Sequence, residues 1–63
     1  MKIIKLIRKT MGITQEELAK RIGVTQGTVA QWENGLTHPA FDKLSKVADV
    51  LGVTVDELIK KAG

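Results

Sequence analysis

The sequence predicts a small all-α domain of five helices. Apolar residues recur at three- and four-residue intervals, which is the spacing of one buried helix face and not of a strand. Gly12, Gly23 and Gly52 each follow such a segment, where a left-handed residue commonly ends a helix. Aromatic residues are only 3% of a chain that is 43% hydrophobic, so we expect an aliphatic core centred on Trp32 and Phe41.

The first helix is expected over about residues 2–10, ending near Gly12. Its apolar spacing predicts three buried side chains, Ile4, Ile7 and Met11. Ile3 and Leu6 exceed what one face requires. We expect both to cover the edge of the core, while a self-association patch and engineering of the sequence remain alternatives.

Thr14 and Glu17 have the spacing of a capping box, in which the threonine hydroxyl accepts from the Glu17 amide and the carboxylate reaches back. A second helix should therefore start at Gln15 and end at Gly23. It should bury Leu18, Ala19 and Ile22. Because Ala19 carries only a methyl group, another helix can cross it closely.

Thr25 is the expected N-cap of a third helix over residues 26–34. Val29 and Trp32 should lie on its buried face. The residues expected to point away are Gln26, Gly27, Ala30 and Gln31. Two short helices around one tight turn indicate a helix-turn-helix, which makes duplex DNA the first ligand to consider. An αα-hairpin in a plain helical bundle is the structural alternative.

Pro39 forbids a direct continuation into the next helix, which is expected over residues 41–51 with Ala40 as a weak N-cap. Its inward residues should be Phe41, Leu44, Val47, Ala48 and Leu51. A second capping box, Thr54 with Glu57, predicts the start of the fifth helix.

From Arg8 to Leu58 the chain resembles the lambda/434-type phage repressor and Cro family, the xenobiotic-response-element class of helix-turn-helix regulators. The matching residues are Gly12-Ile13-Thr14-Gln15, Glu17-Leu18-Ala19, Gly23-Val24-Thr25-Gln26, Trp32-Glu33-Asn34-Gly35, Pro39 and residues 51–58. The resemblance implies a compact lambda-repressor-like fold, with the helix-turn-helix formed by helices 2 and 3. It also implies sequence-specific binding of double-stranded DNA by a transcriptional regulator, with a repressor expected.

Groove chemistry makes Gln26 and Gln31 candidate base readers, because a carboxamide can pair with both N6 and N7 of adenine. The resemblance adds Thr25 and Gly27, although a glycine offers no side chain. It further implies phosphate contacts from Gln15, Asn34 and Thr37, to which we add the two cationic candidates Lys9 and Lys43.

Two further sets of residues follow from the resemblance alone. Arg8 and Glu33 should form a structural ion pair between the first helix and the end of the third. A homodimer contact is expected at Val55, Leu58 and Ile59. That dimer should be weak and form mainly on DNA, with half-sites about one helical turn apart.

The composition limits the remaining possibilities. Sixty-three residues predict one domain over 1–63, and ten Lys/Arg against seven Asp/Glu give a net charge of +3 that permits phosphate binding. The chain has no cysteine and one histidine, so we expect no metal site, no cofactor, no small-molecule ligand and no enzymatic activity. It has no long apolar run, so we expect no membrane span and a cytoplasmic protein. Two alternatives stay open: an engineered or consensus-like scaffold without a cognate operator, and an antitoxin-like protein-binding module.

Overall fold

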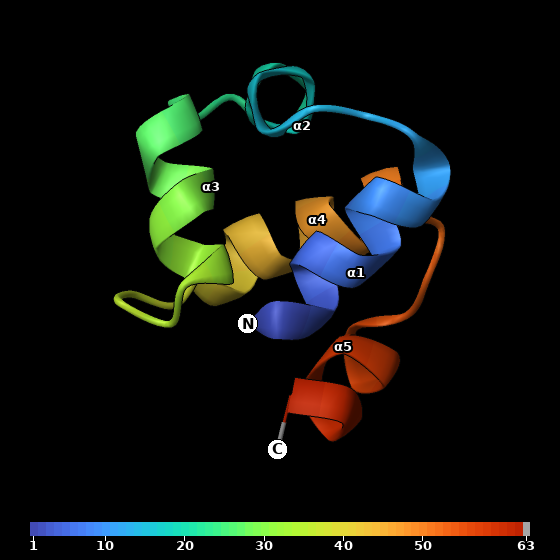
Figure 1. The fold of residues 1–63 in the computed structure, drawn as a ribbon. Helices are drawn as coiled ribbons and strands as arrows, with labels where there is room; N and C mark the ends of the chain where they lie inside the picture. The colour runs from blue at the N-terminus through green and yellow to red at the C-terminus, as the bar shows by residue number, and fades with distance from the viewer. Residues whose placement is uncertain (63) are drawn as a thin grey trace.

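Five helices surround one core in the computed structural model, which describes the backbone of residues 1–62 and the side chains of residues 1–60. In chain order they are α1 (Lys2–Met11), α2 (Gln15–Ile22), α3 (Gln26–Glu33), α4 (Phe41–Leu51) and α5 (Val55–Ala62). α2 is seen end-on in Figure 1 while α3 lies across the view, so these two helices cross steeply. The all-α prediction is confirmed, and each predicted helix is present to within a residue or two at its ends.

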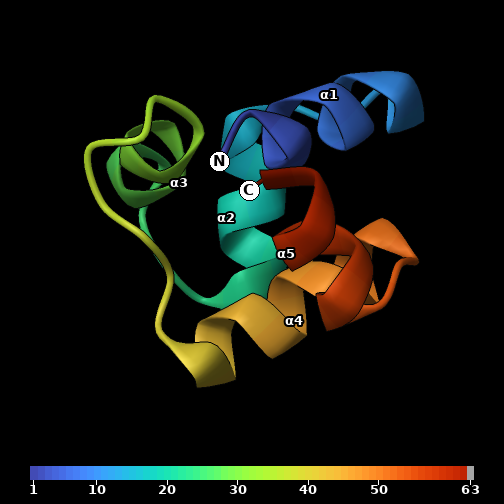
Figure 2. The ribbon, with the colours of Figure 1, turned by 90° about the horizontal axis from the view of Figure 1, so that it is seen from below.

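The core is aliphatic, with Trp32 as its one buried aromatic side chain among the residues described. α1 packs against α3, α4 and α5, and α2 packs against α3 and α4. Viewed from below, α1 lies across one side of this arrangement and a long loop joins α3 to α4 (Figure 2). The buried hydrophobic residues are Ile4, Leu18, Ala19, Ile22, Val29, Trp32, Leu44, Val47, Ala48, Leu51 and Leu58.

Phe41 and Met11 do not join this core, so the prediction that both are buried is wrong. Phe41 is 74% exposed because it is the first residue of α4, and helical side chains lean toward the N-terminus, here past the end of the helix. Met11 is 44% exposed at the last position of α1, and Ile13 in the following turn packs against the core instead. Ile3 covers the core edge as expected, but Leu6 is exposed.

The predicted helix caps are largely confirmed. The Thr14 hydroxyl accepts from the Glu17 amide at 3.0 Å, but the Glu17 carboxylate turns to Arg21, 2.7 Å away, and does not reach back. At α5 both halves of the capping box form, since the Glu57 carboxylate also accepts from the Thr54 amide. Ala40 makes no side-chain cap, as its methyl group requires. Of the helices described, none has the length and hydropathy that a membrane span needs.

Candidate nucleic-acid interface

A tight turn at residues 23–25 sets the angle between α2 and α3. Gly23 has φ 88°, the left-handed region that glycine enters without a Cβ clash, and its amide donates to the Ala19 carbonyl at 2.8 Å. The Val24 amide donates to the same carbonyl, and Thr25 then caps α3 by accepting from the Thr28 amide at 3.2 Å. Ala19 is buried at this crossing. Helices α2 and α3 therefore form a helix-turn-helix.

The outer edge of α3 carries the predicted base-reading residues. Gln26, Gly27 and Gln31 are exposed, while Val29 and Trp32 point into the core. Thr25 is exposed too, but its hydroxyl is already engaged by the Thr28 amide and by the Thr28 hydroxyl at 3.0 Å. The three exposed residues of α3 thus form its free edge, with Thr25 serving first as a cap.

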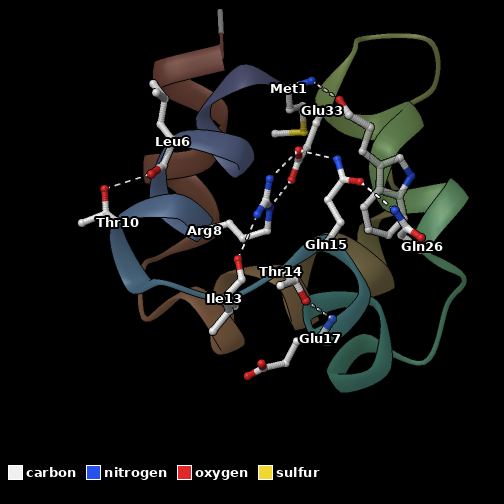
Figure 3. Close-up of polar contacts among 11 residues, drawn as sticks. Met1, Leu6, Arg8, Thr10, Ile13, Thr14, Gln15, Glu17, Gln26 and Glu33 are labelled. Atoms are coloured by element: carbon white, nitrogen blue, oxygen red, sulfur yellow. Dashed lines mark hydrogen bonds and ion pairs between the residues drawn. The ribbon is translucent and has the colours of Figure 1, made fainter.

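Four side chains form a continuous polar row from α1 to the start of α3 (Figure 3). Arg8 donates through Nε to Glu33 Oε2 at 2.7 Å and through Nη2 to Glu33 Oε1 at 3.1 Å. Gln15 Nε2 donates to Glu33 Oε1 at 2.9 Å, and Gln15 Oε1 accepts from Gln26 Nε2 at 3.2 Å. Because a carboxylate only accepts, the nitrogen of Gln15 must face Glu33 and its oxygen must face Gln26.

The predicted pair of Arg8 and Glu33 thus exists and is buried. Burial alone would raise the pKa of the Glu33 carboxyl, but hydrogen bonds from Arg8 and Gln15, with the charges of Arg8 and Lys5, hold that pKa below its ordinary value. The hydrogen bond to Glu33 correspondingly raises the pKa of the Arg8 guanidinium. Both groups are therefore ionised at neutral pH, and the pair links α1 rigidly to the end of α3.

The predicted phosphate-contacting residues are distributed over four parts of the fold. Gln15, half-buried, lies beside Gln26. Asn34 and Thr37 are exposed just after α3, and the Thr37 amide donates to the Gln31 carbonyl at 3.4 Å. Lys9 is exposed on α1, next in sequence to Arg8, and Lys43 is half-buried in the first turn of α4.

Leu58 does not belong to the accessible surface, which corrects its assignment as a dimer contact. It is 0% exposed and packs within the hydrophobic core. Val55 is half-buried against the same core, whereas Ile59 is 53% exposed. Of the three residues, Ile59 alone presents most of an apolar side chain outward.

Several interactions near α3 were not predicted from the sequence. The terminal amine of Met1 donates to the carbonyl of Trp32, the Gln15 amide bonds to Glu33 and Gln26, and the charge of Lys5 helps to lower the pKa of Glu33. The three-residue spacing of Lys5 and Arg8 places them on neighbouring parts of one helix face, which is a signal that sequence reasoning could have used. In the part of the chain whose side chains are described, acidic, histidine and cysteine residues form no group of three suited to a metal ion.

The geometry of α2 and α3 defines a helix-turn-helix protein, and comparison with known proteins agrees. A helix-turn-helix family model matches residues 4–58, and the chain belongs to that family. A solved structure of the P22 c2 repressor in complex with a synthetic operator superposes with a TM-score of 0.85 and 33% identity, over 87% of this chain and 83% of that one. The N-terminal DNA-binding domain of SinR from Bacillus subtilis superposes with a TM-score of 0.81 and 37% sequence identity, over 89% of this chain and 83% of that one.

Curated relatives carry related names. An HTH-type transcriptional regulator of Methanothermobacter thermautotrophicus is 42% identical over 79% of this chain and 72% of its own length. The HTH-type transcriptional activator BcrR of Enterococcus faecalis is 30% identical over 89% of this chain. The chain spans 28% of BcrR and 43% of the related regulator Rv0474 of Mycobacterium tuberculosis.

Proposed function

We propose that this chain binds double-stranded DNA sequence-specifically and acts as a transcriptional regulator, with α3 in the major groove. The observation that carries the proposal is the exposed edge of α3, aligned by the turn at Gly23 and flanked by Gln15. An α-helix fits the major groove of B-DNA, where its N-terminal residues meet base edges. We expect repression, the activity named for the P22 neighbour, in a cytoplasmic protein without enzymatic activity.

Gln26 is the leading candidate for reading a base. One hydrogen of its Nε2 is engaged by Gln15, which leaves the second Nε2 hydrogen and the Oε1 acceptor. An N–H donor and a carbonyl acceptor side by side match N7 and the N6 amine of adenine. Gln31 offers the same chemistry five residues later, about 1.4 turns along α3, whereas Gly27 adds no side chain. We therefore expect an A·T-containing half-site read mainly by glutamines.

Two copies are proposed to bind adjacent half-sites as a weak dimer that forms mainly on DNA. Ile59, and the exposed part of Val55, supply the contact, while Leu58 supports it from the core. So small an apolar area is below what a stable interface buries. We expect a monomer at micromolar concentration by analytical ultracentrifugation, and a dimer that persists on dilution would contradict this.

Selection from a random duplex pool tests the proposal directly. The selected duplex is then titrated against salt with the wild type, Gln26→Ala and, as a matched control on another exposed helix face, Lys46→Ala. Gln26→Ala should cost about 1–3 kcal/mol without changing the salt slope, because it removes a base contact and not a phosphate contact. Weak, sequence-blind binding that Gln26→Ala leaves unchanged would instead support the scaffold alternative.

A further inference from the structure

α1 carries three lysines on one side, Lys2, Lys5 and Lys9, which we call the α1 lysine stripe. At 3.6 residues per turn they fall within about 60° of arc around the helix axis. All three are exposed, and among the residues whose side chains are described none of them forms an ion pair. α1 itself contains no acidic residue that could neutralise them.

The local electrostatics of the fold do not favour this arrangement. Lys2 and Lys5 lie near the N-terminal end of α1, where the helix dipole disfavours cations, and Lys5 and Lys9 are like charges four residues apart. The contrast is Arg21 on α2, whose charge is matched by Glu17 at 2.7 Å. Anions bound from outside the chain would offset both the unfavourable helix dipole and the repulsion between the lysines of the α1 lysine stripe.

Lys5 is the residue of the α1 lysine stripe that lies nearest to α3. It is about 60° from Arg8 around the helix, and Arg8 pairs with Glu33 at the end of α3. Lys2 and Lys9 lie about 120° and 100° from Arg8, farther toward Leu6. The polar row that starts at Arg8 passes through the buried Glu33 carboxylate and ends at Gln26, so hydrogen bonds connect α1 to the reading edge of α3 (Figure 3). Leu6 and Thr10 lie on the far side of the α1 lysine stripe from Arg8.

We propose that the α1 lysine stripe binds phosphates of the DNA backbone flanking the half-site that α3 reads. The inference rests on the proposed function and extends the interface from Lys9 to Lys2 and Lys5. From Lys2 to Lys9 the helix rises about 10 Å, in intervals of about 4.5 and 6 Å, and the flexible four-carbon side chains can extend each ammonium group to a separate phosphate. A linear series of three cations therefore fits a linear series of phosphates.

The test compares two triple variants on the selected duplex. Lys2→Gln/Lys5→Gln/Lys9→Gln removes the α1 lysine stripe, and Lys20→Gln/Lys46→Gln/Lys60→Gln removes three exposed lysines from α2, α4 and α5. Both variants lose three charges, so a general effect of net charge is the same in each. Affinity is measured from 50 to 200 mM salt, on the selected duplex and on a scrambled one.

The stripe variant should lower the slope of log K against log salt by about 2–3, because each phosphate contact contributes about 0.9. The control triple should change it by less than about 1, and Lys5→Gln alone should lower it by about 1. Preference for the selected over the scrambled duplex should stay unchanged in the stripe variant. Thermal unfolding should show a stability close to that of the wild type, since the removed like-charge repulsion offsets the loss of the Lys5 charge near Glu33 and of Lys9 in the last turn of α1.

Equal slopes for the two triple variants would overturn the inference while leaving the proposed function intact. Loss of sequence preference in the stripe variant would also overturn it, because phosphate contacts carry no direct sequence information. Binding to phosphatidylserine vesicles that depends on the three lysines, with an unchanged DNA slope, would assign the surface to membranes. If the wild type binds no duplex at any salt concentration, both proposals fail together.

Discussion

The two sides of the core are held together by different interactions. Around α2 and α3, which we call the polar side, hydrogen bonds between different helices add to apolar packing: the buried pair of Arg8 and Glu33, and the amide of Gln15. Around α4 and α5, which we call the apolar side, the helices meet through side chains such as Leu44 and Leu58. α4 begins without a side-chain cap, and the capping box of α5 acts only at the start of that helix. Hydrophobic contact stabilises without fixing direction, whereas the polar row fixes how α3 is presented.

Breaking the polar side should have the largest effect. Arg8→Met strands the buried Glu33 carboxylate, and we expect a loss of about 3–5 kcal/mol in the free energy of unfolding, measured with urea. The matched control is Arg21→Met, which breaks the ion pair with Glu17, a pair that is about half exposed; it should cost under about 1 kcal/mol. If Arg8→Met were as stable as the wild type, the structural role assigned to the pair of Arg8 and Glu33 would be wrong.

Truncating a buried apolar side chain of α5 should also destabilise the fold. Leu58→Ala deletes a fully buried side chain and should cost about 2–5 kcal/mol in urea unfolding. Its neighbour Ile59 is 53% exposed, and Ile59→Ala should stay within about 0.5 kcal/mol of the wild type. Similar losses in both variants would contradict the orientation of α5.

Low pH should destabilise the fold by protonating Glu33, which pairs with Arg8. The pKa of Glu33 is lower in the folded protein than its ordinary value, so its contribution to stability is complete above that ordinary value and is lost as the pH falls through the folded pKa. Between pH 6 and pH 3 the wild type should lose more stability than Glu33→Gln, which has no carboxyl to titrate. Parallel curves in urea unfolding would show that Glu33 is not the group involved.

A cap can be added where the apolar side lacks one. Ala40 has the extended backbone of an N-cap, with φ −63° and ψ 162°, but no acceptor side chain. Ala40→Asp should stabilise the fold by about 1 kcal/mol by accepting from a free amide of α4 and by placing a negative charge at its N-terminus. Thr25→Ala should lose a similar amount at α3, and thermal unfolding of both variants measures the difference.

The smallest effect is expected at Phe41. Because its ring is 74% exposed, Phe41→Ser should change the free energy of unfolding by less than about 0.5 kcal/mol. A Val47→Ala variant, at a fully buried position of the same helix, should be clearly less stable in the same urea series. A large loss for Phe41→Ser would indicate that the ring packs inward in solution.

The sequence predicted most of the fold because its signals are local. Helix ends follow from Thr14, Thr25, Gly23 and the Thr54 capping box, which act within a few residues. The burial of Leu58 depends on distant elements, and spacing alone could not reveal that it belongs to the core. The exposure of Phe41 has a local cause, its position as the first residue of α4, which the predicted helix start already contained. The contact from Gln15 to Glu33 joins residues 18 apart and required the fold to be known.

The position of Trp32 makes α3 accessible to optical measurement. The chain contains one tryptophan and no tyrosine, so its ultraviolet-excited fluorescence arises almost entirely from this residue. The indole is 3% exposed on the inner face of α3, where the carbonyl of Trp32 also accepts from the terminal amine of Met1. Emission should shift to longer wavelength when the core opens to water. The protein therefore carries an intrinsic reporter within the helix proposed to enter the groove, and titrations can follow that helix without a label.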